Sequence, residues 1–184
     1  MKAKKAQDEG KFKDEIVPVK AKYQDPKTKE TVEMLVENDD GIRVSTMEKL
    51  ATLKTPFKEN GTVTAGSASQ LTDGAAIAFL ARRDWALGHS CPIIAKFIGY
   101  DVIGVEPEYF GKGPAEAIPR VLKKAGLTVD DVDVFEINEA FANVVMYAID
   151  KLGLDPKKVN PNGGAIALGH PLGCTGARML CTLI

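Results

Sequence analysis

The sequence predicts a layered α/β fold, and the evidence lies mainly in its C-terminal half. From Pro92 onward, segments with strand character alternate with segments with helix character. Such alternation is typical of sheets covered by helices. Prolines in the early turns of one helix, and glycines directly after the ends of two, indicate helix boundaries. We expect strands at 93–100, 132–137 and 165–168, and helices at 114–125, 139–152 and from about Cys174.

The first 65 residues are charged and interrupted by turns, and they predict small elements. Residues 1–6 resemble the end of an amphipathic helix whose apolar positions are Ala3 and Ala6. Strand character is present at 15–19 and 31–36, with a turn at 24–27 between them. Further on, Ser45-Thr-Met-Glu48 has capping-box spacing, which predicts a helix through Leu53. The apolar run 75–81 cannot be assigned to helix or strand by periodicity alone.

Composition and charge exclude several classes of protein. The chain has 184 residues, of which 45% are hydrophobic, as in an ordinary globular protein. Its 24 basic and 25 acidic residues leave a net charge of −1, so no global field attracts nucleic acid or an anionic membrane. No apolar run approaches the roughly 20 residues that span a bilayer. Three cysteines without paired spacing indicate neither a disulfide framework nor a zinc site, and they fit a reducing compartment.

The candidate for chemistry is a glycine-rich stretch at 160–178 that contains His170. Glycines at 163, 164 and 169 allow tight turns or close backbone approach, and Pro171 follows the histidine directly. The backbone therefore sets the direction of the imidazole, as it does for a general base or an oxyanion donor. A glycine-rich strand-to-helix turn with a structural histidine is the alternative interpretation.

These residues resemble the thiolase family, and within it the peroxisomal-type 3-ketoacyl-CoA thiolases. Besides the histidine stretch, three blocks support the resemblance in the expected order, and together they span about residues 3–184. It implies a thiolase-like layered α/β fold that is incomplete here. Residues 1–65 would be loop-domain-like, 66–92 the last strand and helix of the N-terminal domain, and 93–184 a C-terminal domain without its closing strands. The three blocks are Gly61–Ala76, Gly111-Lys-Gly-Pro-Ala115 and Glu136-Ile-Asn-Glu-Ala-Phe-Ala142.

The resemblance also implies catalytic roles for two residues. His170 matches the histidine that activates the nucleophilic cysteine and contributes to an oxyanion site. Asn138 matches the asparagine that holds a water in that site, and a neutral amide that both donates and accepts suits this task. Without the family, Asn138 is simply a helix cap. We expect Glu139 to interact with the dipole of the helix that it would begin, although it could instead orient neighbouring groups.

Substrate contacts are implied for four further residues. Ser69 matches a serine that contacts the pantetheine arm, although Ser67 stands where the family usually has asparagine. Phe141 would pack near the thioester, and Phe110 replaces a frequent methionine beside the acyl pocket. Arg43 lies in the region that covers the CoA nucleotide and could meet a phosphate. For Phe141 a core aromatic, and for Arg43 a solvated charge, are the alternatives.

None of the cysteines, Cys91, Cys174 and Cys181, matches a catalytic position of the family. We therefore expect no turnover by this chain alone, and we expect it to need a complementing N-terminal thiolase segment or an oligomer, because half-domains leave open sheet edges and apolar surface.

The implied reaction is thiolytic cleavage of a 3-ketoacyl-CoA, in fatty-acid β-oxidation, with CoA as substrate, no cofactor and no metal. The implied compartment is the peroxisome or the mitochondrion. A non-catalytic assembly subunit and a CoA-binding module without chemistry are the alternatives.

Overall fold

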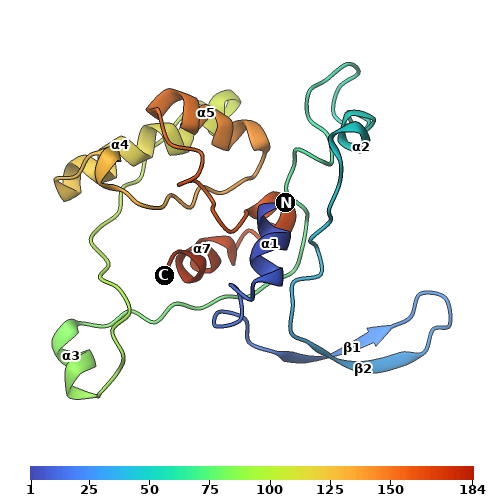
Figure 1. Ribbon diagram of the computed structural model, residues 1–184, viewed down its shortest axis with the longest axis horizontal. Coiled ribbons are helices and arrows are strands. Elements are labelled where there is room, and N and C mark those ends of the chain that lie inside the picture. The colour runs from blue at the N-terminus through green and yellow to red at the C-terminus, as the bar shows by residue number, and fades with distance from the viewer.

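The computed structural model describes all residues, 1–184, as a set of short helices joined by long extended segments (Figure 1). Its one sheet is a two-stranded antiparallel hairpin. No helix is both long enough and apolar enough to cross a membrane. In chain order the elements are α1 (Lys2–Asp8), β1 (Val19–Gln24), β2 (Thr31–Val36), α2 (Met47–Ala51), α3 (Arg83–Gly88), η1 (Pro107–Lys112), α4 (Gly113–Ala125), η2 (Val129–Asp131), α5 (Ala142–Leu152), α6 (Ala165–Leu168) and α7 (Thr175–Leu183).

The main hydrophobic core lies between α4, α5 and the extended segments beside them, and the two helices run together in Figure 1. Gly126 and Gly153 end the two helices in left-handed conformation, as the sequence predicts. Pro119 lies in the second turn of α4. Most of the core residues are alanine or branched aliphatic residues. The core residues are Ala115, Phe135, Ile137, Val145, Ala148, Leu154 and Val159.

The N-terminal helix α1 lies beside the glycine-rich turn of the C-terminal part. Ala3 and Ala6 are buried, which confirms the predicted amphipathic face. The ammonium of Lys2 donates to the carbonyl of Val159 at 2.8 Å. Further along, the hydroxyl of Thr182 in α7 donates to the carboxylate of Glu15 at 2.9 Å. The N-terminal segment is therefore held against the C-terminal part of the chain by these two hydrogen bonds.

The hairpin β1–β2 extends away from the other elements, as Figure 1 shows. Val19 pairs with Val36 and Gln24 with Thr31, so the strand predicted at 31–36 is confirmed. The strand expected at 15–19 is wrong except for its last residue, because turns continue to Glu15 and residues 16–18 have no strand partner. In the connection, the carboxylate of Asp25 accepts the backbone N–H groups at 27 and 28. Neither face of the hairpin is buried.

Short helices form where the sequence predicts them, with shifted boundaries. The helix cap at 45–48 is Thr46 rather than Ser45, since the Thr46 hydroxyl accepts the Lys49 N–H, and α2 ends at Ala51 rather than Leu53. The helix that the resemblance implies within 66–92 is present as α3, which contains Trp85.

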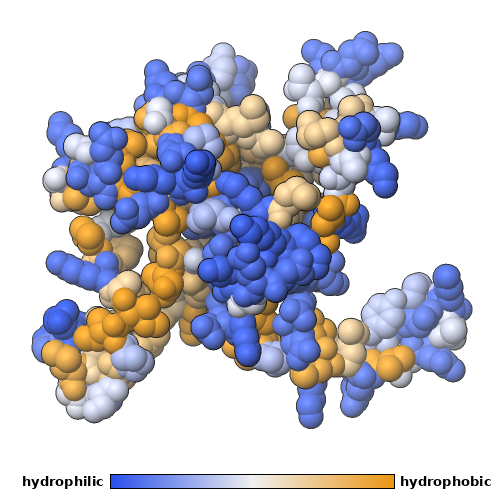
Figure 2. Space-filling model, in the orientation of Figure 1, coloured by the Kyte–Doolittle hydropathy of each residue, from blue (hydrophilic) through white to orange (hydrophobic).

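The segments 93–100 and 132–137, predicted as strands, and the run 75–81, left unassigned, do not form strands. Residues 75–81 and 93–100 form no ladder, and within 132–137 only Phe135 forms a bridge, parallel to Val159. A strand requires continuous pairing with a neighbour, and none of these segments has that among residues 1–184. Their large side chains are consequently exposed, and Figure 2 shows hydrophobic residues gathered near α3. The expectation of exposed apolar surface is thus confirmed at Ile77, Phe79, Leu80, Ile94, Phe97, Ile98, Tyr100 and Val102.

Candidate active site

The histidine is held by the turn between α6 and α7. The run 165–168, expected as a buried strand, is instead the single-turn helix α6, because the N–H groups of Leu168 and Gly169 bond back to the carbonyls of Gly164 and Ala165. A four-residue apolar run does not distinguish the two. Gly169 then reverses the chain at φ 94°, a conformation that favours glycine. The next N–H, that of His170, donates to the carbonyl of Gln70 at 3.0 Å.

Both ring nitrogens of His170 have polar partners. Its Nε2 lies 3.1 Å from Nδ2 of Asn138, and its Nδ1 lies 2.7 Å from Oγ1 of Thr175. The structure thus brings together the two residues that the sequence predicts as catalytic. Thr175 was missed, although its position five residues after the histidine, at the start of a helix, was a usable signal.

Asn138 is not a helix cap. Helix α5 was expected from Glu139, but it begins at Ala142, with Phe141 as the preceding cap residue. Residues 140–142 instead pair with 67–69 through an Ala68–Phe141 bridge, which keeps the chain extended up to the helix. The side chain of Asn138 therefore faces His170, and its Oδ1 is buried without a hydrogen-bond partner.

The side chain of Asn160 holds the segment that contains Asn138 through hydrogen bonds to its backbone. Its amide accepts the N–H of Ile137 and donates to the carbonyl of Ile137, both at 2.8 Å. The backbone N–H of Asn160 also donates to the carbonyl of Phe135. The Asn160 side chain thus extends this backbone pairing to Ile137, the residue before Asn138. Asn160 is 2% exposed and has φ 44°, which asparagine tolerates better than most residues. Sequence reasoning missed it, although an asparagine before Pro161 in a glycine-rich turn was the available signal.

Glu139 orients neighbouring groups rather than the start of its own helix. Its carboxylate accepts the N–H of Ile166, in α6, at 3.1 Å and the amide of Asn160 at 3.2 Å. The favoured expectation, a first-turn interaction in a helix starting at 139, is wrong because that helix starts three residues later. Gly164 makes room for this carboxylate, since a Cβ there would collide with it.

A carboxyl cluster surrounds Arg178 on α7. The guanidinium lies 3.8 Å from Glu136, whose side chain is 5% exposed. Burial raises the pKa of Glu136 to about 7, and the nearby Arg178 opposes that shift. Burial likewise raises the pKa of Glu15 and of Asp39, again against the opposing charge of Arg178. The Arg178–Glu136 pair and the Thr182–Glu15 hydrogen bond connect α7, and with it Thr175, to two other parts of the chain.

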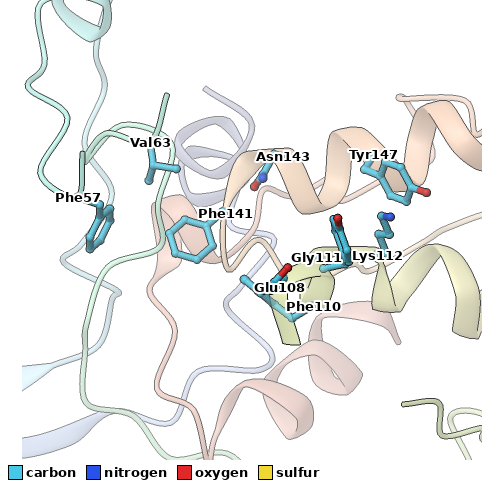
Figure 3. Close-up of a pocket in the computed structure, with 10 residues that line it drawn as sticks. Phe57, Val63, Glu108, Phe110, Gly111, Lys112, Phe141, Asn143 and Tyr147 are labelled. Atoms are coloured by element: carbon cyan, nitrogen blue, oxygen red, sulfur yellow. The ribbon is translucent and has the colours of Figure 1, made fainter. Parts of the chain in front are cut away.

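A cavity of about 520 Å³ opens beside this site, and Figure 3 shows its lining. Phe110 and Phe141 both line it, with ring centroids 6.1 Å apart in an edge-to-face arrangement. Neither His170 nor Asn138 lines this cavity. It is bounded by Phe57, Val63, Glu108, Tyr109, Phe110, Gly111, Lys112, Phe141, Asn143 and Tyr147.

The remaining predicted residues lie at different distances from these groups. Ser69 is on the segment paired with 140–142, so it lies next to Phe141 in the pairing. Arg43 is exposed, forms no ion pair and does not line the cavity. The structure therefore groups Ser69, Phe110 and Phe141, and it leaves Arg43 apart.

The three cysteines are free, and none is a hydrogen-bond partner of His170. Cys174 is buried at the start of α7, and burial raises its pKa. Cys181 is on the same helix and Cys91 follows α3. The structure contains no group of three or more His, Cys, Asp or Glu side chains placed to hold a metal ion.

Comparison with known proteins gives a consistent result. Residues 1–84 match the family model for the thiolase N-terminal domain, and residues 91–184 match that for the thiolase C-terminal domain. The chain is 56% identical over 185 aligned residues to the peroxisomal 3-ketoacyl-CoA thiolase of Homo sapiens, with 100% of this chain and 43% of that protein covered.

Among solved structures, the dimeric peroxisomal thiolase of Saccharomyces cerevisiae matches with a TM-score of 0.87 and 48% identity, over 100% of this chain and 44% of that one. Human mitochondrial 3-ketoacyl-CoA thiolase in complex with CoA matches with a TM-score of 0.86 and 39% identity, over 99% and 44%. The predicted fold class is confirmed. The chain spans about two fifths of the length of the curated relatives it matches. The division at residues 65 and 92 stays a prediction.

Proposed function

This chain belongs to the thiolase family, and from that premise we propose that it supplies the histidine and asparagine of a site that transfers an acyl group between a 3-ketoacyl-CoA and CoA. The observation that carries the proposal is the 3.1 Å contact between His170 Nε2 and Asn138 Nδ2. Thiolysis needs a thiolate, a base that creates it and donors for charge on a thioester oxygen. An imidazole and an amide side by side supply the base and the donors.

In this proposal Nε2 of His170 takes the proton of a thiol. The thiolate then attacks the 3-keto carbon, and the bond between C2 and C3 breaks, which leaves the acyl group on the sulfur and releases the enolate of acetyl-CoA. The imidazolium N–H and the Asn138 amide donate to the thioester oxygen on which this charge is placed. The imidazolium gives its proton to C2 of the enolate, which completes acetyl-CoA. Nε2 then takes the proton of the CoA thiol, the CoA sulfur attacks the acyl group on the external thiol, and the imidazolium returns that proton to the thiolate that leaves. The products are acetyl-CoA and an acyl-CoA shortened by two carbons.

The reacting thiol comes from polypeptide outside these 184 residues. The support is that none of the three cysteines contacts His170, and that burial raises the pKa of Cys174. A thiol with a raised pKa is a weaker source of thiolate. Association with a complementing thiolase segment, or with another copy, would also cover the exposed extended segments near α3.

Substrate would reach the site along the aromatic cavity. Phe110 and Phe141 give it an apolar wall suited to an acyl chain, and Ser69 lies beside Phe141 for the pantetheine arm. Arg43 is free to meet a phosphate of CoA, since no carboxylate pairs with it. CoA would act as substrate, and the proposed chemistry uses no metal or further cofactor. Relatives named as peroxisomal and mitochondrial support one of these two compartments.

A chimera tests the proposal. The 184 residues replace the matching segment of the human peroxisomal 3-ketoacyl-CoA thiolase, to which they are 56% identical. We expect the chimera to cleave acetoacetyl-CoA, followed as loss of the enolate absorbance, and the 184-residue chain alone to show no turnover. His170→Ala should lower kcat by roughly 10²–10⁴-fold, as loss of a general base does.

His89→Ala is the matched control, because that histidine is exposed directly after α3 and its ring stacks on and bonds to Trp85, away from His170. A folded chimera without turnover would contradict the proposal and favour the non-catalytic assembly subunit. CoA binding without turnover would favour the CoA-binding module. Robust turnover by the 184-residue chain alone would contradict the proposal that the reacting thiol comes from another stretch of polypeptide. No feature of the site favours either alternative, since the pair of His170 and Asn138 is intact.

A further inference from the structure

Thr175 is the second partner of the histidine. It is 4% exposed and lies in the first turn of α7. Its Oγ1 is 2.7 Å from Nδ1 of His170 and 3.0 Å from the carbonyl oxygen of Pro171, four residues earlier. A threonine hydroxyl has one proton, so it can donate to only one of these two atoms.

The geometry indicates which atom receives that proton. A carbonyl oxygen can only accept, so the 3.0 Å contact is favourable when the hydroxyl donates to Pro171, as threonine hydroxyls in helices do toward a carbonyl three or four residues earlier. With the proton given to Pro171, Oγ1 accepts from His170, which therefore carries its proton on Nδ1. The opposite nitrogen, Nε2, then has a free lone pair, and the Asn138 Nδ2 amide facing it at 3.1 Å is a donor. The hydrogen bonds then run in one direction: the Asn138 amide donates to Nε2, Nδ1–H donates to the Thr175 hydroxyl, and that hydroxyl donates to the Pro171 carbonyl.

We propose that Thr175 is a positioning residue that holds His170 in the tautomer protonated at Nδ1, so that Nε2 is the base. The inference rests on the proposed function for its purpose, but the tautomer itself can be observed without substrate. The tautomer matters because a ring protonated at Nε2 would present a proton, and not a lone pair, to the incoming thiol.

Nitrogen-15 NMR of the imidazoles tests this directly, since a protonated and a bare ring nitrogen have widely separated shifts. The chain has two histidines, and His89→Gln assigns the signals. Spectra are recorded about two pH units above the ordinary imidazole pKa of about 6.5, where the neutral ring dominates. We expect His170 to show a protonated Nδ1 and a bare Nε2.

Two variants separate the hydroxyl from the shape of the side chain. Thr175→Val keeps the shape but places a methyl group against Nδ1, and we expect it to lose the Nδ1-protonated pattern while the His89 signals stay unchanged. Thr175→Ser restores a hydroxyl and should restore the pattern, a rescue that a merely structural role would not produce.

A wild-type ring protonated at Nε2 would overturn the proposal, as would an unchanged pattern in Thr175→Val. If Thr175→Val does not fold, Thr175→Ser still decides, because a serine variant protonated at Nε2 contradicts the role of the hydroxyl. A correct tautomer in a chimera without thiolysis would overturn only the proposed function. Thiolysis by a chimera whose ring has the wrong tautomer would overturn only the role of Thr175.

Discussion

Replacing Asn160 by alanine tests whether one side chain holds the strand-like segment under the site. Its amide is the only hydrogen-bond partner of the backbone N–H and carbonyl of Ile137, a residue 5% exposed. Asn160→Ala leaves both groups unpaired, at about 1–3 kcal/mol each. Alanine at φ 44° adds about 1–2 kcal/mol. Because water reaches part of the gap, we expect the free energy of unfolding to fall by about 3–5 kcal/mol.

Urea unfolding followed by far-ultraviolet circular dichroism measures this change through the midpoint and slope. Asn160→Gly removes the same hydrogen bonds but accepts the positive φ, so it should be about 1 kcal/mol less destabilising than Asn160→Ala. Asn162→Ala is the matched control on the same turn. Asn162 is partly buried and its side chain makes no hydrogen bond, so its loss should stay within about 0.5 kcal/mol.

Hydrogen exchange adds a local measurement. In Asn160→Ala the Ile137 amide should exchange much faster than in the wild type, because its acceptor is gone. The reasoning is refuted if Asn160→Ala lies within about 1 kcal/mol of Asn162→Ala while the Ile137 amide stays protected.

Three further changes probe the surroundings of the site. The pKa of Glu136 is about 7 in the folded state, against 4.5 for an ordinary glutamate, so between these pH values the folded state binds more protons than the unfolded state. The free energy of unfolding therefore falls as pH rises through this window, by at most about 3 kcal/mol. Urea midpoints at pH 5 and 8 should show this fall, and Glu136→Gln should reduce it, with the two neighbouring carboxyls leaving a remainder; an unchanged fall would contradict the assignment. Gly164→Ala places a Cβ in the space of the Glu139 carboxylate, which must move away from the Ile166 N–H and the Asn160 amide; the loss of these hydrogen bonds should cost about 1–3 kcal/mol by urea unfolding. Gly173→Ala meets open space, and equal losses would refute the steric argument. Cys174 should be the slowest of the three thiols to react with iodoacetamide at neutral pH, measured by peptide mass spectrometry, because burial raises its pKa; the fastest reaction there would contradict that burial.

The site shows where sequence reasoning succeeds. The histidine stretch, the Asn138 block and the helix caps at Gly126 and Gly153 depend on local residue types. Their roles in turns and caps could therefore be predicted from spacing and from resemblance. The contact between Asn138 and His170 confirms that the two blocks meet.

It also shows where such reasoning stops. A four-residue apolar run fits a strand or a helical turn equally well, and α6 was decided by its carbonyl bonds and by the Glu139 carboxylate under it. The start of α5 was decided by pairing with residues 67–69, a partner distant in the sequence.

By itself, the sequence determined the family, the helices that end at Gly126 and Gly153 and the identity of the two facing polar side chains, because these depend on local patterns. Only the tertiary structure decided what holds them. Asn160, Thr175 and Glu139 act through bonds to atoms that the folded backbone brings near, and their acceptors and donors cannot be read from spacing. The physical reason is that a hydrogen bond depends on distances of about 3 Å, which chain separation does not fix.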